Sequence, residues 1–192
     1  MMGEKDQNKL IIFAIAAICL CAIAAVVLYA NPFFEEEQIN WNVTLVGSRG
    51  ETKVVTFDEI KKMPSYEGYG GFFTTVGIKH GPFKCEGVPV EDLCNLVGGV
   101  GPSNTVWVYA PDGYLMVFDY DQLKGDFNTY DPATLREVPH GDLKIVLVYK
   151  QDGAYLSDDY GRPLRIAILT PRDKLMIEGS YCVKWVDRIE VK

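Results

Sequence analysis

The sequence lacks any surplus of positive charge. Its 192 residues include 19 lysines and arginines against 26 aspartates and glutamates, which gives a formal net charge of −7. A protein that binds nucleic acid needs a basic face for the phosphates, and binding to anionic lipid headgroups needs basic clusters. The composition therefore argues against nucleic acid as a partner and against tight contact with anionic headgroups.

Histidine is also scarce, and three of the five cysteines lie beyond residue 30. His80 and His140 each stand beside a glycine in a predicted loop, and no carboxylate pattern around them indicates a metal site, so we expect structural or exposed roles. Cys85, Cys94 and Cys182 follow the N-terminal region, and an odd number cannot form a closed disulfide framework. One alternative pairs Cys85 with Cys94; the other makes all three small buried apolar side chains.

Internal repeats, a βαβ series and the standard glycine-rich phosphate loops are missing as well. What the chain does have is an uncharged apolar run from Leu10 to Ala30. As a helix this run would reach roughly 30 Å, the thickness of a hydrocarbon core. We predict a transmembrane helix over 10–30. A cleaved signal peptide is the alternative, although Leu28 occupies a position where cleavage favours a small residue.

The charges that flank the apolar run predict its orientation. Lys5 and Lys9 precede the run, whereas Glu35, Glu36 and Glu37 follow it. Because basic residues favour the cytoplasmic side, we predict a cytoplasmic N-terminus over residues 1–9 and an extracytoplasmic domain. Residues 31–40 read as a linker, and residues 41–192 as one folded domain, so the chain is predicted to be a single-pass protein of the cell membrane.

Short strands dominate the predicted domain. The alternating or apolar segments are Trp41–Val46, Thr52–Phe57, Phe72–Gly77, Thr105–Ala110, Tyr114–Phe118, Lys144–Tyr149, Pro163–Leu169 and Tyr181–Val191. Two short helices are predicted, one capped by Thr56 and one over 90–97, where Cys94 lies on the apolar face. The glycine- and tyrosine-rich segment Tyr66–Gly71 is predicted as a loop. The pattern indicates a strand-dominated α+β domain.

Two further clusters have a functional and a structural interpretation. Tyr66, Tyr69, Phe72 and Phe73 either form an aromatic lip over a binding site or pack their rings on the core. The basic stretch made by Arg162, Arg165, Arg172 and Lys174 either binds an anion or forms a solvated edge.

The order of four segments resembles the molybdopterin-binding domain of the sulfite oxidase family. The segments are Val55–Ile60, Gly87–Leu93, Asp112-Gly113-Tyr114, and Gly161–Ile166 followed by Val183–Val191. The resemblance covers the chain from about Trp41 to its end. It implies a sulfite-oxidase-like fold, molybdopterin as cofactor and a molybdopterin-dependent oxidoreductase activity.

The resemblance also identifies candidate site residues. In the family a cysteine thiolate binds the metal, and that position falls here near Val76 or Gly77, which cannot donate to a metal. No metal ligand is therefore predicted, with Cys85 as a displaced alternative. The family's pterin-phosphate loop corresponds to Ser180, Tyr181 and Cys182, with Lys184 as a phosphate partner. The predicted cofactor-binding residues are Gly77, Ser180, Tyr181, Cys182 and Lys184.

Three functions are compatible with these features. The first is an anchored molybdopterin-dependent redox subunit, with an altered or lost metal site and a membrane or extracytoplasmic redox partner. The second is a non-catalytic binding module with an open groove near Gly77, Tyr181 and Lys184. The third is an assembly subunit of a membrane redox complex. The first is the main prediction, because the family resemblance covers the whole domain. The fold alone does not choose among the three functions.

Overall fold

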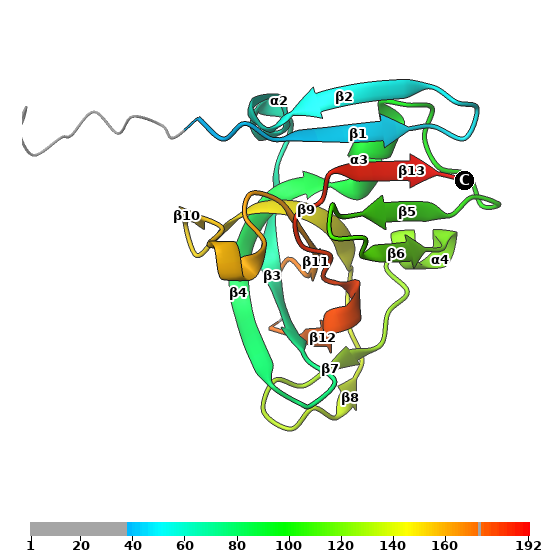
Figure 1. Ribbon diagram of the computed structural model, residues 1–192. Helices are drawn as coiled ribbons and strands as arrows, with labels where there is room; N and C mark the ends of the chain where they lie inside the picture. The colour runs from blue at the N-terminus through cyan, green and yellow to red at the C-terminus, as the bar shows by residue number, and fades with distance from the viewer. Residues whose placement is uncertain (1–37, 173) are drawn as a thin grey trace, which may run out of the picture. The chain divides into compact units, whose positions relative to one another are not determined.

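The computed structural model describes residues 38–172 and 174–192 (Figure 1). Contacts divide the chain into two units, Met1–Gln38 and Ile39–Lys192, and the second unit carries the described elements. Within the described ranges, no helix has both the length and the apolar character needed to cross a membrane. The predicted cytoplasmic segment, transmembrane helix and most of the linker lie outside the described residues.

The first sheet joins segments from both ends of the domain. Its strand order is β2-β1-β13-β5-β6, and β1 pairs with β13 in parallel while the other neighbours are antiparallel. Its strands are β1 (Asn42–Val46), β2 (Thr52–Thr56), β5 (Val106–Tyr109), β6 (Leu115–Phe118) and β13 (Arg188–Val191). The alternation of buried and exposed residues places Val43, Leu45, Ile189 and Val191 in the core.

The second sheet carries the longer strands. It runs in the order β10-β9-β4-β3-β12-β7-β8, and β11 pairs with β9 outside this path. Its strands are β3 (Tyr66–Phe73), β4 (Lys79–Pro89), β7 (Thr129–Tyr130), β8 (Glu137–Val138), β9 (Lys144–Gln151), β10 (Ala154–Tyr155), β11 (Arg165–Leu169) and β12 (Met176–Glu178).

This second sheet curls so that β11 meets β3 as well as β9. Thr170, directly after β11, forms a bridge with Tyr69 of β3. The approach is close: a Cβ atom on Gly70 would lie 2.5 Å from the Ile168 carbonyl oxygen. The curl encloses a small second core, which consists of Cys85, Val146, Val148, Leu156, Ala167 and Leu169. The prediction of a loop over Tyr66–Gly71 is wrong, because the glycines there permit strand contact.

The helices are short. They are α2 (Phe57–Lys62), α3 (Val90–Asn95), α4 (Tyr120–Leu123) and the two 3-10 turns η1 (Asp158–Tyr160) and η2 (Gly179–Tyr181). Thr56 begins α2 with the predicted cap, since its hydroxyl accepts from the Glu59 amide. Cys94 lies in the main core with its α3 neighbour Leu93, as predicted. The strand-dominated α+β class is confirmed.

Candidate functional site

The site is built around Arg165, the first residue of β11. Alternation along the strand puts Arg165 on the same face as Ala167 and Leu169, which belong to the second core. Its side chain is consequently 1% exposed, as deeply buried as the apolar residues around it. The interpretation of the basic stretch as a solvated edge is wrong for this residue.

Two of the three guanidinium nitrogens of Arg165 have no partner in the part of the chain that the structure describes. Neither Nε nor Nη1 has a hydrogen-bond partner among the described residues, and both atoms are shielded from solvent. Because arginine stays protonated at any ordinary pH, this is a buried positive charge with free donors. An uncompensated buried charge costs several kcal/mol, and an oxyanion would satisfy both the charge and the donors.

Aromatic rings enclose the guanidinium. Phe72 of β3 lies 5.3 Å and Tyr160 of η1 lies 5.5 Å from the Arg165 carbon Cζ, measured to the ring centroids. The His80 ring stacks on Phe72 at 4.7 Å, and Phe83 meets Tyr160 edge-on at 5.2 Å. These contacts give cation–π stabilisation and exclude water from the charge. Phe72 therefore packs its ring at the site.

Two free thiols lie beside the same guanidinium. Burial raises the pKa of the Cys85 thiol to about 11, although the positive charge of Arg165 works in the opposite direction. The Cys182 thiol shows the same balance, with burial raising its pKa to about 11 against the field of Arg165. Both side chains, and the core Cys94 with a pKa raised to about 12, are protonated at neutral pH. All three are free cysteines.

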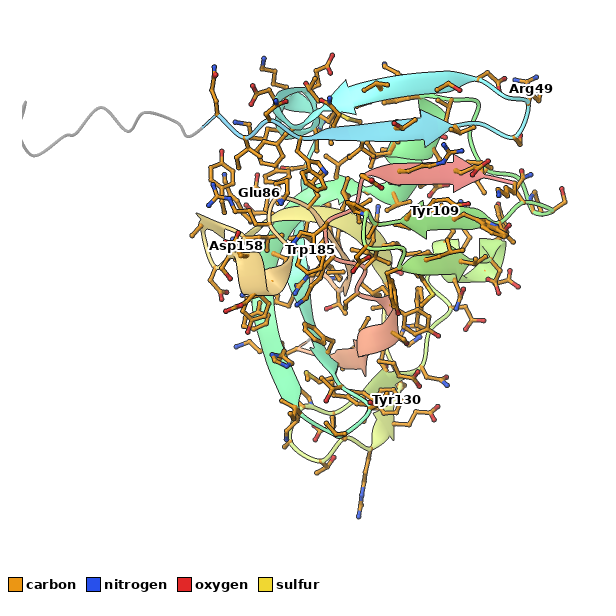
Figure 2. The ribbon with its side chains drawn as sticks, viewed as in Figure 1. Arg49, Glu86, Tyr109, Tyr130, Asp158 and Trp185 are labelled. Carbon is orange, nitrogen blue, oxygen red and sulfur yellow. The ribbon has the colours of Figure 1, made fainter. Side chains whose placement is uncertain are left out.

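Lys184 supplies a second cation. The segment that carries it runs beside β11, and the backbones of Lys184 and Arg165 form an isolated antiparallel β-bridge. Its Nζ donates a hydrogen bond to the Asp159 carbonyl oxygen in η1. Trp185, the next residue, has a positive φ of 56°. A bulky side chain rarely adopts this conformation, so the backbone is strained where it follows Lys184. Asp158 and Trp185 mark the two segments in Figure 2.

The predicted phosphate loop forms η2 and the residues after it. Tyr181 turns its ring into an aromatic cluster, 6.0 Å from Phe118 and 5.2 Å from Phe127. The Ser180 carbonyl accepts a hydrogen bond of 2.8 Å from the Tyr114 hydroxyl. Of the predicted loop residues, the structure therefore brings Cys182 and Lys184 to Arg165, while Tyr181 packs elsewhere.

Gly77 lies away from this group. β3 ends at Phe73, and residues 74–77 form the turn of the β3–β4 hairpin, where the Gly77 amide donates to the Thr74 carbonyl over 2.8 Å. A Cβ atom at Gly77 would meet nothing within 4 Å. The predicted strand over Phe72–Gly77 is therefore wrong beyond Phe73. Gly179 of η2 packs on Phe73, with 2.9 Å between its would-be Cβ and the Phe73 oxygen.

Sequence reasoning missed the roles of Tyr160 and Phe72. It placed Arg165 in a basic stretch without singling it out. A signal was present, because Arg165 is the one charged residue in the segment Leu164–Leu169, whose other members are all apolar. A charged residue inside an apolar strand is rarely buried unless it has a partner or binds a ligand. The contacts of Tyr160 and Phe72 depend on the curl of the sheet, which no local pattern shows.

Fold and site together define a class: a strand-dominated domain of the sulfite-oxidase-like kind, with a buried cation at its centre. The family model described as the oxidoreductase molybdopterin binding domain matches residues 30–192. The chain belongs to this family. Comparison with curated proteins gives no match.

Solved structures share the fold. The sulfane dehydrogenase SoxCD from Paracoccus pantotrophus superposes with a TM-score of 0.58 at 16% sequence identity. The match covers 79% of this chain and 38% of that chain. The chain thus spans well under half the length of this larger protein, and the likeness concerns the fold.

The cofactor that the family implies has an anionic phosphate and a metal. The site has donors for the phosphate, but the expected metal-ligand position has none. The donor set suits the phosphate, because Arg165 has two unpartnered buried donors and the backbone of Lys184 pairs with that of Arg165. The metal has no donor at Val76 or Gly77, which lie in the hairpin turn. Across the described ranges, no three side chains of the His, Cys, Asp and Glu types are grouped as a metal site. The sulfur atoms beside Arg165 belong to Cys85 and Cys182.

Proposed function

We propose that this chain binds molybdopterin through the cofactor's phosphate and serves as a redox subunit with an altered metal site. The observation that carries the proposal is the buried guanidinium of Arg165 with its two unpartnered nitrogens. In a family that binds a phosphate-bearing pterin, such a group matches the ligand's charge and its need for donors. Lys184 is the second cation for the same phosphate.

The residues of the chain have separable tasks. Arg165 and Lys184 bind the phosphate, while the rings of Phe72 and Tyr160, 5.3 and 5.5 Å from Arg165 Cζ, keep water from the guanidinium of the unloaded protein. When bound, molybdopterin supplies a molybdenum centre that exchanges electrons with a substrate. Because Val76 and Gly77 carry no donor side chain, the metal's protein ligand differs from the family pattern or is lost.

The proposed location is the outer face of the cell membrane, with one N-terminal anchor. Its support comes from sequence: the uncharged run Leu10–Ala30, the lysines before it and the glutamates after it. An anchored domain of this kind passes electrons to a membrane or extracytoplasmic partner.

The test measures pterin in the full-length chain purified from cells supplied with molybdate. Denaturation of the wild type is expected to release a fluorescent pterin in near-stoichiometric amount. Arg165→Met is expected to lose most of it, because the phosphate loses both donors and its counter-charge. Arg172→Met removes an exposed arginine of the same basic stretch and is the matched control. A wild type that contains neither pterin nor molybdenum would contradict the proposal.

A further inference from the structure

Both cations of the site are held by one short turn. The Tyr160 ring of η1 lies over the Arg165 guanidinium, and the Asp159 carbonyl of η1 accepts from Lys184 Nζ. We propose that η1 is a lid that occupies the anion site of the unloaded protein and lifts when a phosphate binds. This inference rests on the proposed function, and it adds Tyr160 and Asp159 as residues that control access to the site.

The closed state leaves no path for a phosphate to Arg165. Tyr160 shields one face of the guanidinium and Phe72 lies at 5.3 Å from it, while Phe83 and His80 support Tyr160 edge-on at 5.2 and 6.1 Å. The result is the 1% exposure of Arg165. A phosphate that reaches Nε and Nη1 must displace one of these rings. Tyr160 is the ring on a short turn, whereas Phe72, His80 and Phe83 lie within paired strands.

The turn itself is weakly anchored. Its backbone hydrogen bonds run from the amides of Tyr160 and Gly161 to the carbonyls of Ser157 and Asp158, each 3.0 Å, and from the Arg162 amide to the Ser157 carbonyl at 3.2 Å. Asp158 and Asp159 are exposed, so Tyr160 is the side chain of η1 that packs on the protein. Local openings draw on short segments with few contacts, and the Tyr160 ring, which packs against the second core, is the main contact of η1.

Gly161 ends the lid, and Lys184 and Trp185 lie on the segment beside it. Gly161 follows η1 with φ at 85°, and a Cβ there would come within 2.7 Å of Lys184 Cβ, so the end of the lid lies directly on Lys184. Trp185, on the other side of Lys184, holds the strained φ of 56°. Strain of this kind persists where the surrounding contacts enforce it. Release of Lys184 from Asp159 frees both segments.

Binding of inorganic phosphate to the full-length chain in detergent tests the lid. In Tyr160→Ala the ring no longer competes for Arg165, so the dissociation constant is expected to fall about tenfold relative to wild type. Tyr160→Phe keeps the ring and is expected to bind as wild type does. Arg165→Met is expected to abolish binding in both backgrounds.

The outcomes separate the lid from the function. If Arg165→Met abolishes binding but Tyr160→Ala binds no tighter than wild type, the lid is refuted and the anion site stands. If phosphate binding is absent or indifferent to Arg165→Met, the anion site is refuted together with the lid. If Tyr160→Ala fails to fold, amide hydrogen exchange in the wild type tests the lid instead. Saturating phosphate is expected to speed exchange at the Tyr160 and Gly161 amides, and unchanged or slower exchange overturns the lid.

Discussion

At the scale of single residues, the buried charge of Arg165 lowers the stability of the fold but suits the binding of an anion. Its charge is fully buried, two of its nitrogens have no partner, and its compensation comes from two ring faces rather than a carboxylate. Replacing a poorly compensated buried charge by an apolar side chain of similar volume is often neutral or stabilising. A buried guanidinium with so little compensation from the protein therefore indicates a bound anion.

Arg165→Met is therefore expected to leave the free energy of unfolding of the ligand-free chain unchanged or to raise it by up to about 3 kcal/mol. Urea unfolding of the two proteins, both stripped of ligand, measures this difference. A loss of stability of about 3 kcal/mol or more would show that the arginine is a structural partner with satisfied contacts.

The thiols give a second prediction at this scale, concerning pH. The folded pKa of Cys85 is raised from 9.0 to about 11 by burial, so the folded state keeps its proton where the unfolded state loses it. The stabilisation from this thiol is complete below about pH 9 and is lost as the pH rises from about 9 to about 11. Two pKa units correspond to about 3 kcal/mol.

The measurement compares the wild type with Cys85→Ala, since lysines and tyrosines titrate in the same range in both proteins. We expect the difference in unfolding free energy between them to change by about 2 to 3 kcal/mol from pH 8 to pH 11, with the wild type losing more. A constant difference over that range would mean that Cys85 reaches solvent in the folded protein.

At the scale of elements, sequence patterns predicted those segments whose structure is local. The helix capped by Thr56, the strands on either side of Asp112-Gly113 and the apolar strand β9 follow from side chains near one another in sequence. The strand β3 could not be predicted in this way, because its glycines are explained by β11, about 100 residues later in the chain. The glycines let the backbone of β11 approach β3 closely, whereas the local sequence pattern indicates a flexible loop.

Gly70 tests this explanation of β3. In Gly70→Ala the new Cβ would come within 2.5 Å of the Ile168 carbonyl oxygen, which is backbone and cannot move aside cheaply. We expect the unfolding free energy to fall by about 2 to 4 kcal/mol and phosphate binding to weaken, since β11 carries Arg165.

Gly101→Ala is the matched control. Its Cβ would meet the Asn104 side-chain oxygen at 3.3 Å, a contact that a shift of a few tenths of an ångström relieves. A change within about 0.5 kcal/mol is expected for this variant. An equally small effect in Gly70→Ala would mean that β3 and β11 are not in close contact.

At the scale of the whole molecule, the family resemblance could be predicted from the order of four short segments, and the family model over residues 30–192 confirms it. The residues that form the site could not be predicted from the sequence. Arg165, Cys85, Phe72 and Tyr160 come from β11, β4, β3 and η1, and the curl of one sheet brings them together. Of the predicted residues, Lys184 and Cys182 join this group, whereas Gly77 remains at the hairpin turn.

The placement of the domain outside the membrane stays a prediction. Val76 is 78% exposed at the hairpin turn and is a suitable position for a label. In intact cells, Val76→Cys is expected to react with a membrane-impermeant maleimide, while Lys5→Cys is expected to react only after the cells are broken. Labelling of Lys5→Cys in intact cells, with Val76→Cys protected, would reverse the proposed orientation.

The central claim is that Arg165 is the receptor for the phosphate of a bound pterin. A crystal structure of the full-length chain, purified with its cofactor, measures this directly. The account predicts a phosphate oxygen within hydrogen-bond distance of Arg165 Nε or Nη1, with Lys184 turned from Asp159 toward the same phosphate. A pterin bound elsewhere, with Arg165 still unpartnered beneath Tyr160, would contradict it.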